Sequence, residues 1–154
     1  MLKIVRTSSD DRDFRSLVTL LDAELRDIYG ELQNTYDSYN KTELINNVVV
    51  AYEDAIPVGC GCFKTYTSDI AEVKRMFVPK DFRGKSISKM ILSELERWMI
   101  EKKFIKSILE TGVKQTAAIS LYSKSGYLKI ENYGPYAKLD TSVCMSKVLQ
   151  SAHS

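Results

Sequence analysis

The segment from Ala71 to Met99 restricts the fold more than any other part of this chain. It reads AEVKRMFVPK DFRGKSISKM ILSELERWM, which is a strand pattern, a short basic turn and an amphipathic helix pattern. Pro79 ends the strand because proline has no amide hydrogen to donate to a sheet. The helix is predicted over residues 85–102 from apolar residues at helical spacing, which are Ile87, Ile91, Leu95 and Trp98.

The junction between this strand and this helix has the composition of an anion site. Phosphates bind at helix N-termini because the first-turn amide hydrogens lack partners and the helix dipole is positive there. Gly84 lets the backbone approach a ligand, and Arg83 and Lys85 add positive charge. A P-loop is excluded, since that motif needs a glycine five residues before Gly-Lys-Ser, where this chain has Pro79. The remaining pattern predicts a pyrophosphate site, with an ordinary basic helix start as the alternative.

The rest of the chain predicts a mixed α/β sheet. A first helix is expected over residues 10–29, capped by Ser8 or Ser9 and stopped by Gly30. Residues 31–41 predict a polar loop, which is followed by a candidate short helix over residues 43–46. Strands and helices are expected to alternate from Ile70 onward, which favours an α/β fold over a bundle or sandwich. Strands are predicted at 48–52, 58–66, 70–78, 106–111, 127–131 and 142–148, and a last helix at 115–125.

Composition excludes several classes of function. A length of 154 residues predicts one domain over residues 1–154, and a net charge of +2 indicates neither a nucleic-acid nor a membrane partner. The N-terminus turns polar within six residues and no apolar run approaches the roughly 20 residues of a membrane span, so a cytoplasmic protein is expected. The one histidine, His153, lies in the terminal tail, which argues against His-dependent hydrolases. Cys60 and Cys62 are expected to be small residues of a strand rather than metal ligands, and no metal is predicted.

Two motifs together resemble a known family. The span EVKRMFVPKDFRGKSISKMIL and the later LETGVKQTAAISLYSKSGY are similar to the GNAT superfamily of acetyl-CoA-dependent acetyltransferases. Its signature is Arg/Gln-x-x-Gly-x-Gly/Ala after a strand, followed later by Leu-Tyr-x-x-x-Gly-Tyr/Phe. The resemblance extends from about Val48 to Val148 and implies a mixed, mostly antiparallel twisted sheet of about six to seven strands with about four helices.

The resemblance also implies a binding site for acetyl-CoA. It makes Met76 and Val78 backbone partners of the pantetheine arm, while amide hydrogens around Phe77 and Val78 polarise the thioester. The implied pyrophosphate cradle consists of Arg83, Gly84, Lys85, Ser86, Ile87 and Ser88. Further cofactor contacts are implied for Gln115, Ala118, Tyr122 and Lys124. Ser86 and Ser88 stand where the family usually has glycine or alanine, and each adds a side chain beside the ligand.

The same resemblance implies groups for the proton transfers. An amine with a pKa near ~10 must lose a proton before it attacks a thioester, so a base is required. Glu72 matches the base position of histone-type members and is preferred. Glu110 matches the base proposed in ribosomal-protein acetyltransferases and remains the alternative, and either glutamate is also compatible with a purely structural role. Tyr122 matches the general acid near the sulfur, with simple hydrogen bonding to the sulfur as the alternative.

The resemblance also implies where the acceptor would bind. Family members shape the acceptor pocket with the first-helix loop and the last hairpin, which here implies Tyr29, Tyr36, Tyr133 and Tyr136. Arg75 is expected to bind an acceptor carboxylate or to pair with a glutamate. A small-molecule amine or amino acid is the preferred acceptor, by direct transfer in a ternary complex of a monomer or homodimer. The alternatives are a protein or peptide acetyltransferase and a non-catalytic acyl-CoA-binding sensor.

Overall fold

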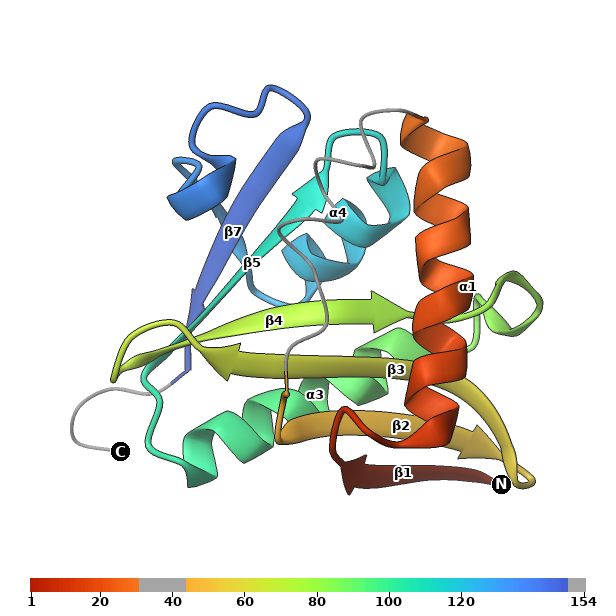
Figure 1. Ribbon diagram of the computed structural model, residues 1–154. Helices are drawn as coiled ribbons and strands as arrows, with labels where there is room; N and C mark the ends of the chain where they lie inside the picture. The colour runs from red at the N-terminus through yellow and green to blue at the C-terminus, as the bar shows by residue number, and fades with distance from the viewer. Residues whose placement is uncertain (31–43, 150–154) are drawn as a thin grey trace. The chain divides into compact units, whose positions relative to one another are not determined.

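Residues 1–30 and 44–149 are described by the structure, which is a computed structural model (Figure 1). In chain order the elements are β1 (Leu2–Thr7), α1 (Arg12–Tyr29), β2 (Asn47–Glu53), β3 (Ile56–Thr65), β4 (Ile70–Phe77), the 3-10 helix η1 (Lys80–Phe82), α3 (Ile87–Glu101), β5 (Lys106–Gly112), α4 (Thr116–Lys124), β6 (Leu128–Ile130), the 3-10 helix η2 (Gly134–Tyr136) and β7 (Ser142–Val148). The chain divides into two compact units: Met1–Lys64 with Lys74–Leu95, and Thr65–Val73 with Glu96–Ser154.

Strand β4 contributes residues to both units, and the strands follow the hydrogen-bonded order β1-β2-β3-β4-β5-β7-β6. This seven-stranded mixed sheet confirms the predicted α/β class. Three α-helices lie within residues 1–30 and 44–149, where about four were expected. None of the helices described there is long and apolar enough to cross a membrane.

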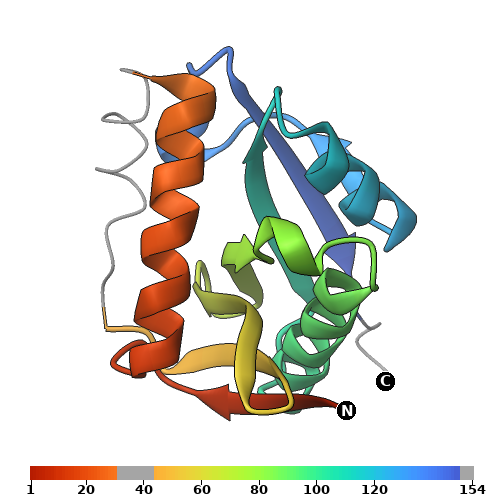
Figure 2. The same cartoon turned by 90° about the vertical axis from the view of Figure 1, so that its right-hand side faces the viewer.

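In the first unit, antiparallel strands present one face to α1 and the other to α3. β1 pairs with β2 and β2 with β3, and Asp54 and Ala55 form the tight turn between β2 and β3 with positive φ angles. Figure 2 shows α1 on one side of these strands and α3 on the other. Because side chains alternate along a strand, the strand residues that pack with α1 are every second one, and they are Val48, Val50, Cys60 and Cys62.

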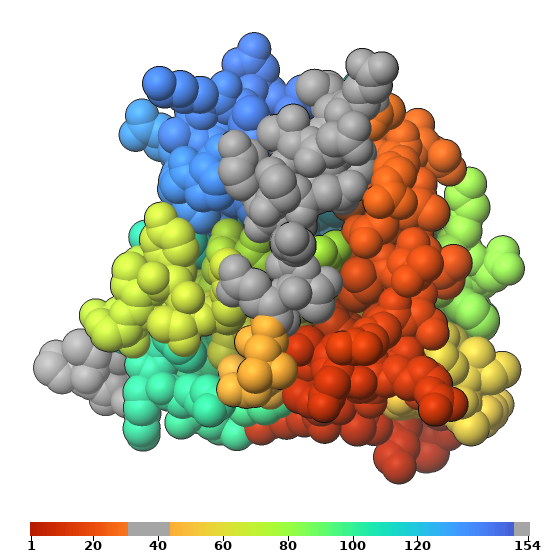
Figure 3. All heavy atoms as spheres, viewed as in Figure 1, coloured from red at the N-terminus to blue at the C-terminus, as the bar shows by residue number. Residues whose placement is uncertain are grey.

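Helix α1 forms because its apolar residues recur on one face and its first turn is capped. Phe14, Leu17 and Leu21 are buried in the core with the strands, whereas its outer side is at the surface of this unit (Figure 3, red to orange). The predicted cap at Ser8 or Ser9 is wrong. The Asp11 carboxylate accepts from the amide of Phe14 at 3.0 Å, because the Ser9 hydroxyl is used to accept from Ile45 instead. The helix ends at Gly30, as predicted, and the φ of this glycine is 59°.

Two glycines of β3 allow α3 to approach the other face closely. A Cβ atom at Gly59 would lie 2.8 Å from Ile91 Cδ1 and 3.0 Å from Val78 Cγ2. One at Gly61 would lie 3.1 Å from Leu95 Cδ1. These distances are shorter than normal carbon contacts, so the helix packs directly on the strand backbone.

The turn before α3 contains a second conformational constraint. Ser86 precedes the first helical residue, and its carbonyl accepts from the amide of Met90 at 3.1 Å. Its φ of 63° lies in the left-handed region, which glycine occupies at much lower cost than serine. The serine that departs from the family signature therefore occupies a glycine-type backbone conformation.

In the second unit, β4 pairs in parallel with β5 over residues 70–73 and 106–109, and β5 pairs antiparallel with β7. The short strand β6 pairs with the outer side of β7. β7 covers the predicted range 142–148, and the predicted strands at 106–111 and 127–131 correspond to β5 and β6. The strand β1 was not predicted, since its apolar start is short.

We expect Gly59→Ala to lower the free energy of unfolding by about 2 kcal/mol, because the added methyl group overlaps the ends of Ile91 and Val78. Urea denaturation measures the change. Ser93→Ala, on the exposed side of α3, serves as the control and should alter stability by less than about 0.5 kcal/mol. Equal stability of Gly59→Ala and the wild type would contradict the close packing.

We expect the Ser86→Gly variant to be more stable toward unfolding than the Ser86→Ala variant, by about 1 kcal/mol. Both variants remove the hydroxyl, but only glycine removes the cost of the left-handed conformation. Thermal unfolding of the two variants, compared with each other, isolates the backbone term. An alanine variant as stable as the glycine variant would show that this turn is unstrained.

Candidate active site

The turn before α3 offers exposed main chain at the N-terminus of a 15-residue helix. Residues 83–86 are all exposed, and a Cβ atom built on Gly84 would have no atom within 4 Å. The φ of Gly84 is 81°, so two of these four residues have left-handed backbone. Open backbone, the first turn of a helix and basic side chains fit a pyrophosphate group.

Arg83 is held in place by two partners within its own unit. Its Nε donates to the carbonyl of Val78 at 2.8 Å, and a terminal nitrogen contacts Glu24 Oε1 of α1 at 2.6 Å. The side chains of this ion pair are 42% and 30% exposed. A phosphate bound at this turn would compete with Glu24 for the guanidinium.

The other cradle residues differ in what they expose. Lys85 is exposed, with its ammonium 5.9 Å from the Phe82 ring centroid. Ser88 is half-buried in the first turn of α3, whereas the side chain of Ile87 is buried in the core. Ile87 therefore has only main-chain groups to offer a ligand.

The end of β4 contains the residues predicted to pair with the pantetheine arm. The side chains of Phe77 and Val78 are buried. The ladder of β4 with β5 covers residues 70–73, so the segment Lys74–Phe77 lies beyond it. Main-chain amides in such a segment are the kind of group that an extended ligand pairs with.

Arg75 lies in this segment and has a carboxylate partner. Its guanidinium contacts Asp22 Oδ1 of α1 at 2.8 Å, and its side chain is 9% exposed. The sequence suggested either an acceptor carboxylate or a glutamate as its partner. In the structure its partner is an aspartate of the protein.

Glu72 is buried in the second unit, and its partner is a tyrosine that was predicted to line the pocket for the acetyl acceptor. It is 4% exposed, and the Tyr133 hydroxyl donates to its Oε2 at 2.6 Å. Burial, and then the charge of Glu72, raise the pKa of the Tyr133 hydroxyl, which therefore stays a neutral donor. The ring of Tyr133 packs edge-on against Tyr66 and against the buried Tyr136, at centroid distances of 5.3 and 5.7 Å.

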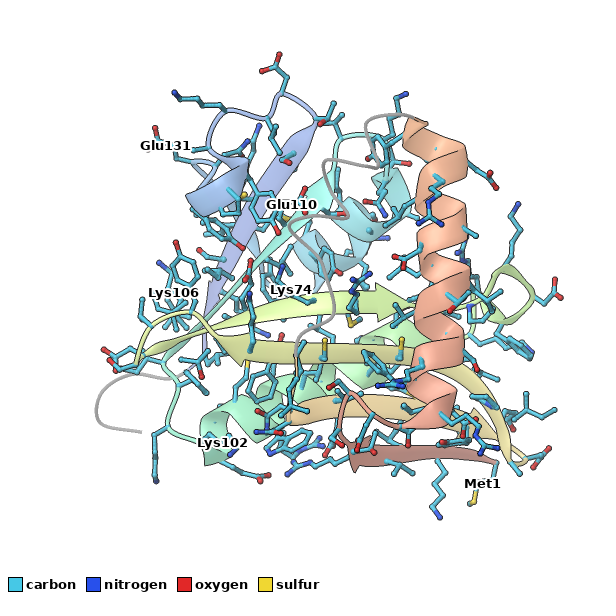
Figure 4. All side chains as sticks on the ribbon, viewed as in Figure 1. Met1, Lys74, Lys102, Lys106, Glu110 and Glu131 are labelled. Atoms are coloured by element: carbon cyan, nitrogen blue, oxygen red, sulfur yellow. The ribbon has the colours of Figure 1, made fainter. Side chains whose placement is uncertain are left out.

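Glu110, labelled on β5 in Figure 4, is the second candidate base. Its Oε2 accepts from the Ser142 hydroxyl of β7 at 2.8 Å, and the residue is half-buried. Both candidate carboxylates are thus hydrogen-bonded by a hydroxyl group, and Glu72 is the more deeply buried of the two.

Tyr122 lies on α4 with its side chain buried against Tyr127. Burial raises the pKa of the Tyr122 hydroxyl, and the charge of Glu110 raises it further. The phenol is therefore neutral and a weak acid. It can donate a hydrogen bond more readily than it can release a proton.

The remaining predicted contacts have varied surroundings. Gln115 Oε1 accepts from the amide of Gly112 at 2.9 Å and from the Thr111 hydroxyl at 3.1 Å, which fixes the turn between β5 and α4. On α4, Ala118 is half-buried one turn before Tyr122, and Lys124 is exposed. Tyr29 is buried at the end of α1, and Tyr36 lies outside the described residues.

Three partners of the candidate residues were not found from the sequence. In the sequence, Asp22 and Glu24 resemble ordinary acidic residues on the solvent-exposed face of a helix, and Tyr66 resembles a residue at the end of a strand. No local pattern marks them, because their partners are 53, 59 and 67 residues away. Groups of three or more His, Cys, Asp and Glu able to hold a metal ion are absent from residues 1–30 and 44–149.

Comparisons with known proteins identify the family of this chain. Residues 14–127 match the sequence model of the acetyltransferase (GNAT) family. An IAA acetyltransferase of Azospirillum brasilense is 33% identical over 135 residues, which cover 86% of this chain and 88% of that protein.

Two solved structures show the same fold. A Klebsiella pneumoniae protein assigned as an acyl-CoA N-acyltransferase has a TM-score of 0.82 at 26% identity, over 97% of this chain and 99% of that one. The PaiA N-acetyltransferase of Thermoplasma acidophilum, solved with coenzyme A, has a TM-score of 0.67 at 19% identity, over 96% and 99%. Because the family model matches most of this chain, the chain belongs to the GNAT family of acetyltransferases and is an acetyl-CoA-dependent N-acetyltransferase.

Proposed function

We propose that this enzyme acetylates a primary amine of a small molecule or an amino acid, by direct transfer in a ternary complex, with residues 1–154 acting as one domain. The observation that carries the proposal is the buried carboxylate of Glu72, hydrogen-bonded by Tyr133. Glu72 lies on the same strand as Met76 and Phe77, four and five residues away. A buried carboxylate on the strand that is proposed to hold the cofactor is suited to removing a proton from an amine.

In this proposal the cofactor is held by main-chain groups and by the basic turn. Met76, Phe77 and Val78 offer amides and carbonyls to the pantetheine arm, and the turn Arg83–Ser88 binds the pyrophosphate. Acetyl-CoA supplies the acetyl thioester when bound. The Phe77 and Val78 amide hydrogens polarise its carbonyl.

Glu72 is proposed to accept the proton of the acceptor amine, directly or through one water molecule. An aliphatic ammonium has a pKa near ~10, so without a base almost none of it is nucleophilic at neutral pH. Tyr133 keeps the Glu72 carboxylate in a fixed orientation. Tyr136 and Tyr29 are proposed to contact the acceptor, together with Tyr133.

Tyr122 is proposed to hold the sulfur of the cofactor as a neutral hydrogen-bond donor. Its raised pKa makes complete proton transfer to a thiolate of pKa near ~8.5 unfavourable, which favours the hydrogen-bonding role over that of a general acid. A donor at that position still stabilises the leaving thiolate.

The cysteines support direct transfer over an acetyl-enzyme route. Cys60, Cys62 and Cys144 are all buried, and burial raises the pKa of the Cys60 and Cys144 thiols. A thiol with a raised pKa carries little of the thiolate that attacks a thioester.

The function is tested by release of free thiol from acetyl-CoA in the presence of a panel of amines. The panel holds alkyl and aryl amines, amino acids and short peptides with a free N-terminus. IAA is tested beside these amines as a separate compound, because the Azospirillum relative is named for it. We expect turnover with small amines or amino acids. Turnover restricted to peptides would replace the proposal by a peptide acetyltransferase, and thiol release equal to that without amine would refute both.

The two candidate bases are separated by matched amide variants. We expect Glu72→Gln to lower kcat by about 10²- to 10⁴-fold across the pH range, because glutamine still accepts the Tyr133 hydrogen bond but cannot take a proton. Glu110→Gln, which likewise keeps an acceptor for Ser142, is expected to retain activity within about ten-fold. The reverse result would assign the base to Glu110, and wild-type rates in both variants would exclude both glutamates.

A further inference from the structure

Arg75 has a backbone conformation that is unusual for its place in the fold. Five residues other than glycine have positive φ angles among those described, and four of them lie in turns or at a helix end. Arg75, with a φ of 59°, is the one inside a strand. A non-glycine residue in this region is strained, so surrounding interactions must hold it there.

The interaction that holds Arg75 comes from α1. The guanidinium contacts Asp22 Oδ1 at 2.8 Å, and the two side chains are only 9% and 25% exposed. The Phe77 side chain, two residues further along β4, packs in the core that α1 covers. The ion pair therefore ties the backbone of β4 to α1 just before Met76.

Two thiols of the neighbouring strand β3 donate to the carbonyls of the two peptide groups that flank the Cα atom of Arg75. The thiol of Cys62 donates to the carbonyl of Lys74 at 3.2 Å, and that of Cys60 to the carbonyl of Arg75 at 3.4 Å. In a regular strand successive carbonyls point in opposite directions, so contacts to both from one strand indicate a local irregularity. Changing φ at Arg75 would rotate the peptide groups on its two sides relative to each other.

We infer that Asp22 and Arg75 are positioning residues, which fix the direction of the main-chain groups of Met76, Phe77 and Val78 toward acetyl-CoA. The inference rests on the proposed role of these three residues in holding the cofactor. The ion pair compensates the strain at Arg75, and the strained conformation sets the orientation of the amides that follow. Neither side chain touches the cofactor in this arrangement.

Acetyl-CoA dissociation constants test the inference, because the role is conformational and a backbone change can restore it. Arg75→Ala loses the ion pair and keeps the cost of positive φ, so the strand relaxes and the dissociation constant should rise about ten-fold. Arg75→Gly also loses the ion pair, but glycine occupies positive φ freely, and its affinity should stay within about two- to three-fold of the wild type. Asp22→Ala should weaken binding as Arg75→Ala does. Adding Asp22→Ala to Arg75→Gly should cause no further loss.

Glu94→Gln provides the matched control. It removes the Arg6–Glu94 ion pair of the same unit, whose nitrogen–oxygen distance is 2.7 Å. This variant should change the melting temperature of the ligand-free protein and leave the acetyl-CoA dissociation constant unchanged. Melting temperatures of all variants without ligand separate folding defects from binding defects.

Several results would overturn the inference. Wild-type affinity in Arg75→Ala would do so, as would an Arg75→Gly variant as weak as Arg75→Ala. If Arg75→Ala does not fold, the comparison of Asp22→Ala with the Asp22→Ala/Arg75→Gly double variant decides, and equal weakening in both refutes the positioning role. A wild-type protein that binds no acetyl-CoA would refute the proposed cofactor site itself.

Discussion

Strand β4 pairs with β5 over four residues and then continues as a segment with its own constraints. Its first half places Glu72 in a parallel ladder, where the buried carboxylate is reached by a tyrosine hydroxyl. Its second half contains Arg75 with positive φ, followed by two residues proposed to face the cofactor. A regular strand would direct successive groups by simple alternation, so the irregularity at Arg75 is what gives this segment its own geometry.

Helix α1 supplies carboxylates to two arginines of β4 and the turn that follows it, and the two ion pairs differ in kind. The Arg83–Glu24 pair is partly exposed and contributes only about 0–1 kcal/mol to stability, so the proposed phosphate would replace the glutamate at small cost. The Arg75–Asp22 pair is largely buried, and removing one partner would leave a charge without compensation. The first pair is therefore weak enough to exchange with the proposed phosphate, whereas the second is the pair proposed to hold the backbone.

In the second unit Tyr122 is a neutral group near Glu110, and Tyr133 is a neutral group beside Glu72. Burial raises the pKa of Tyr122 and of Tyr133, and a neighbouring glutamate raises each further. Each phenol therefore stays uncharged near a glutamate, and the Tyr133 hydroxyl donates a hydrogen bond to Glu72. The hydrogen bond from Tyr133 fixes the orientation of the Glu72 carboxylate, which is proposed to accept the proton of the amine.

The sequence alone determined the elements with a strong local pattern and the family. Alternating or continuous apolar residues predicted the six strands β2 to β7 to within about two residues, and α1, α3 and α4 were predicted as helices. The motif around Arg83 with the later Leu121–Tyr127 indicated an acetyltransferase. Local signals also failed where a competing long-range contact won. Ser9 is used by Ile45, so Asp11 caps α1, and β1 is a strand because β2 pairs with it.

Only the tertiary structure decided the partners of the functional groups. Glu72 and Tyr133 are 61 residues apart, and Arg75 and Asp22 are 53 apart, so neither pair leaves a trace in local spacing. The φ angles of Arg75 and Ser86 are likewise set by packing and by the start of α3, against the preference of both residue types. Periodicity records which face of an element is buried, whereas hydrogen bonds and strain depend on which elements meet.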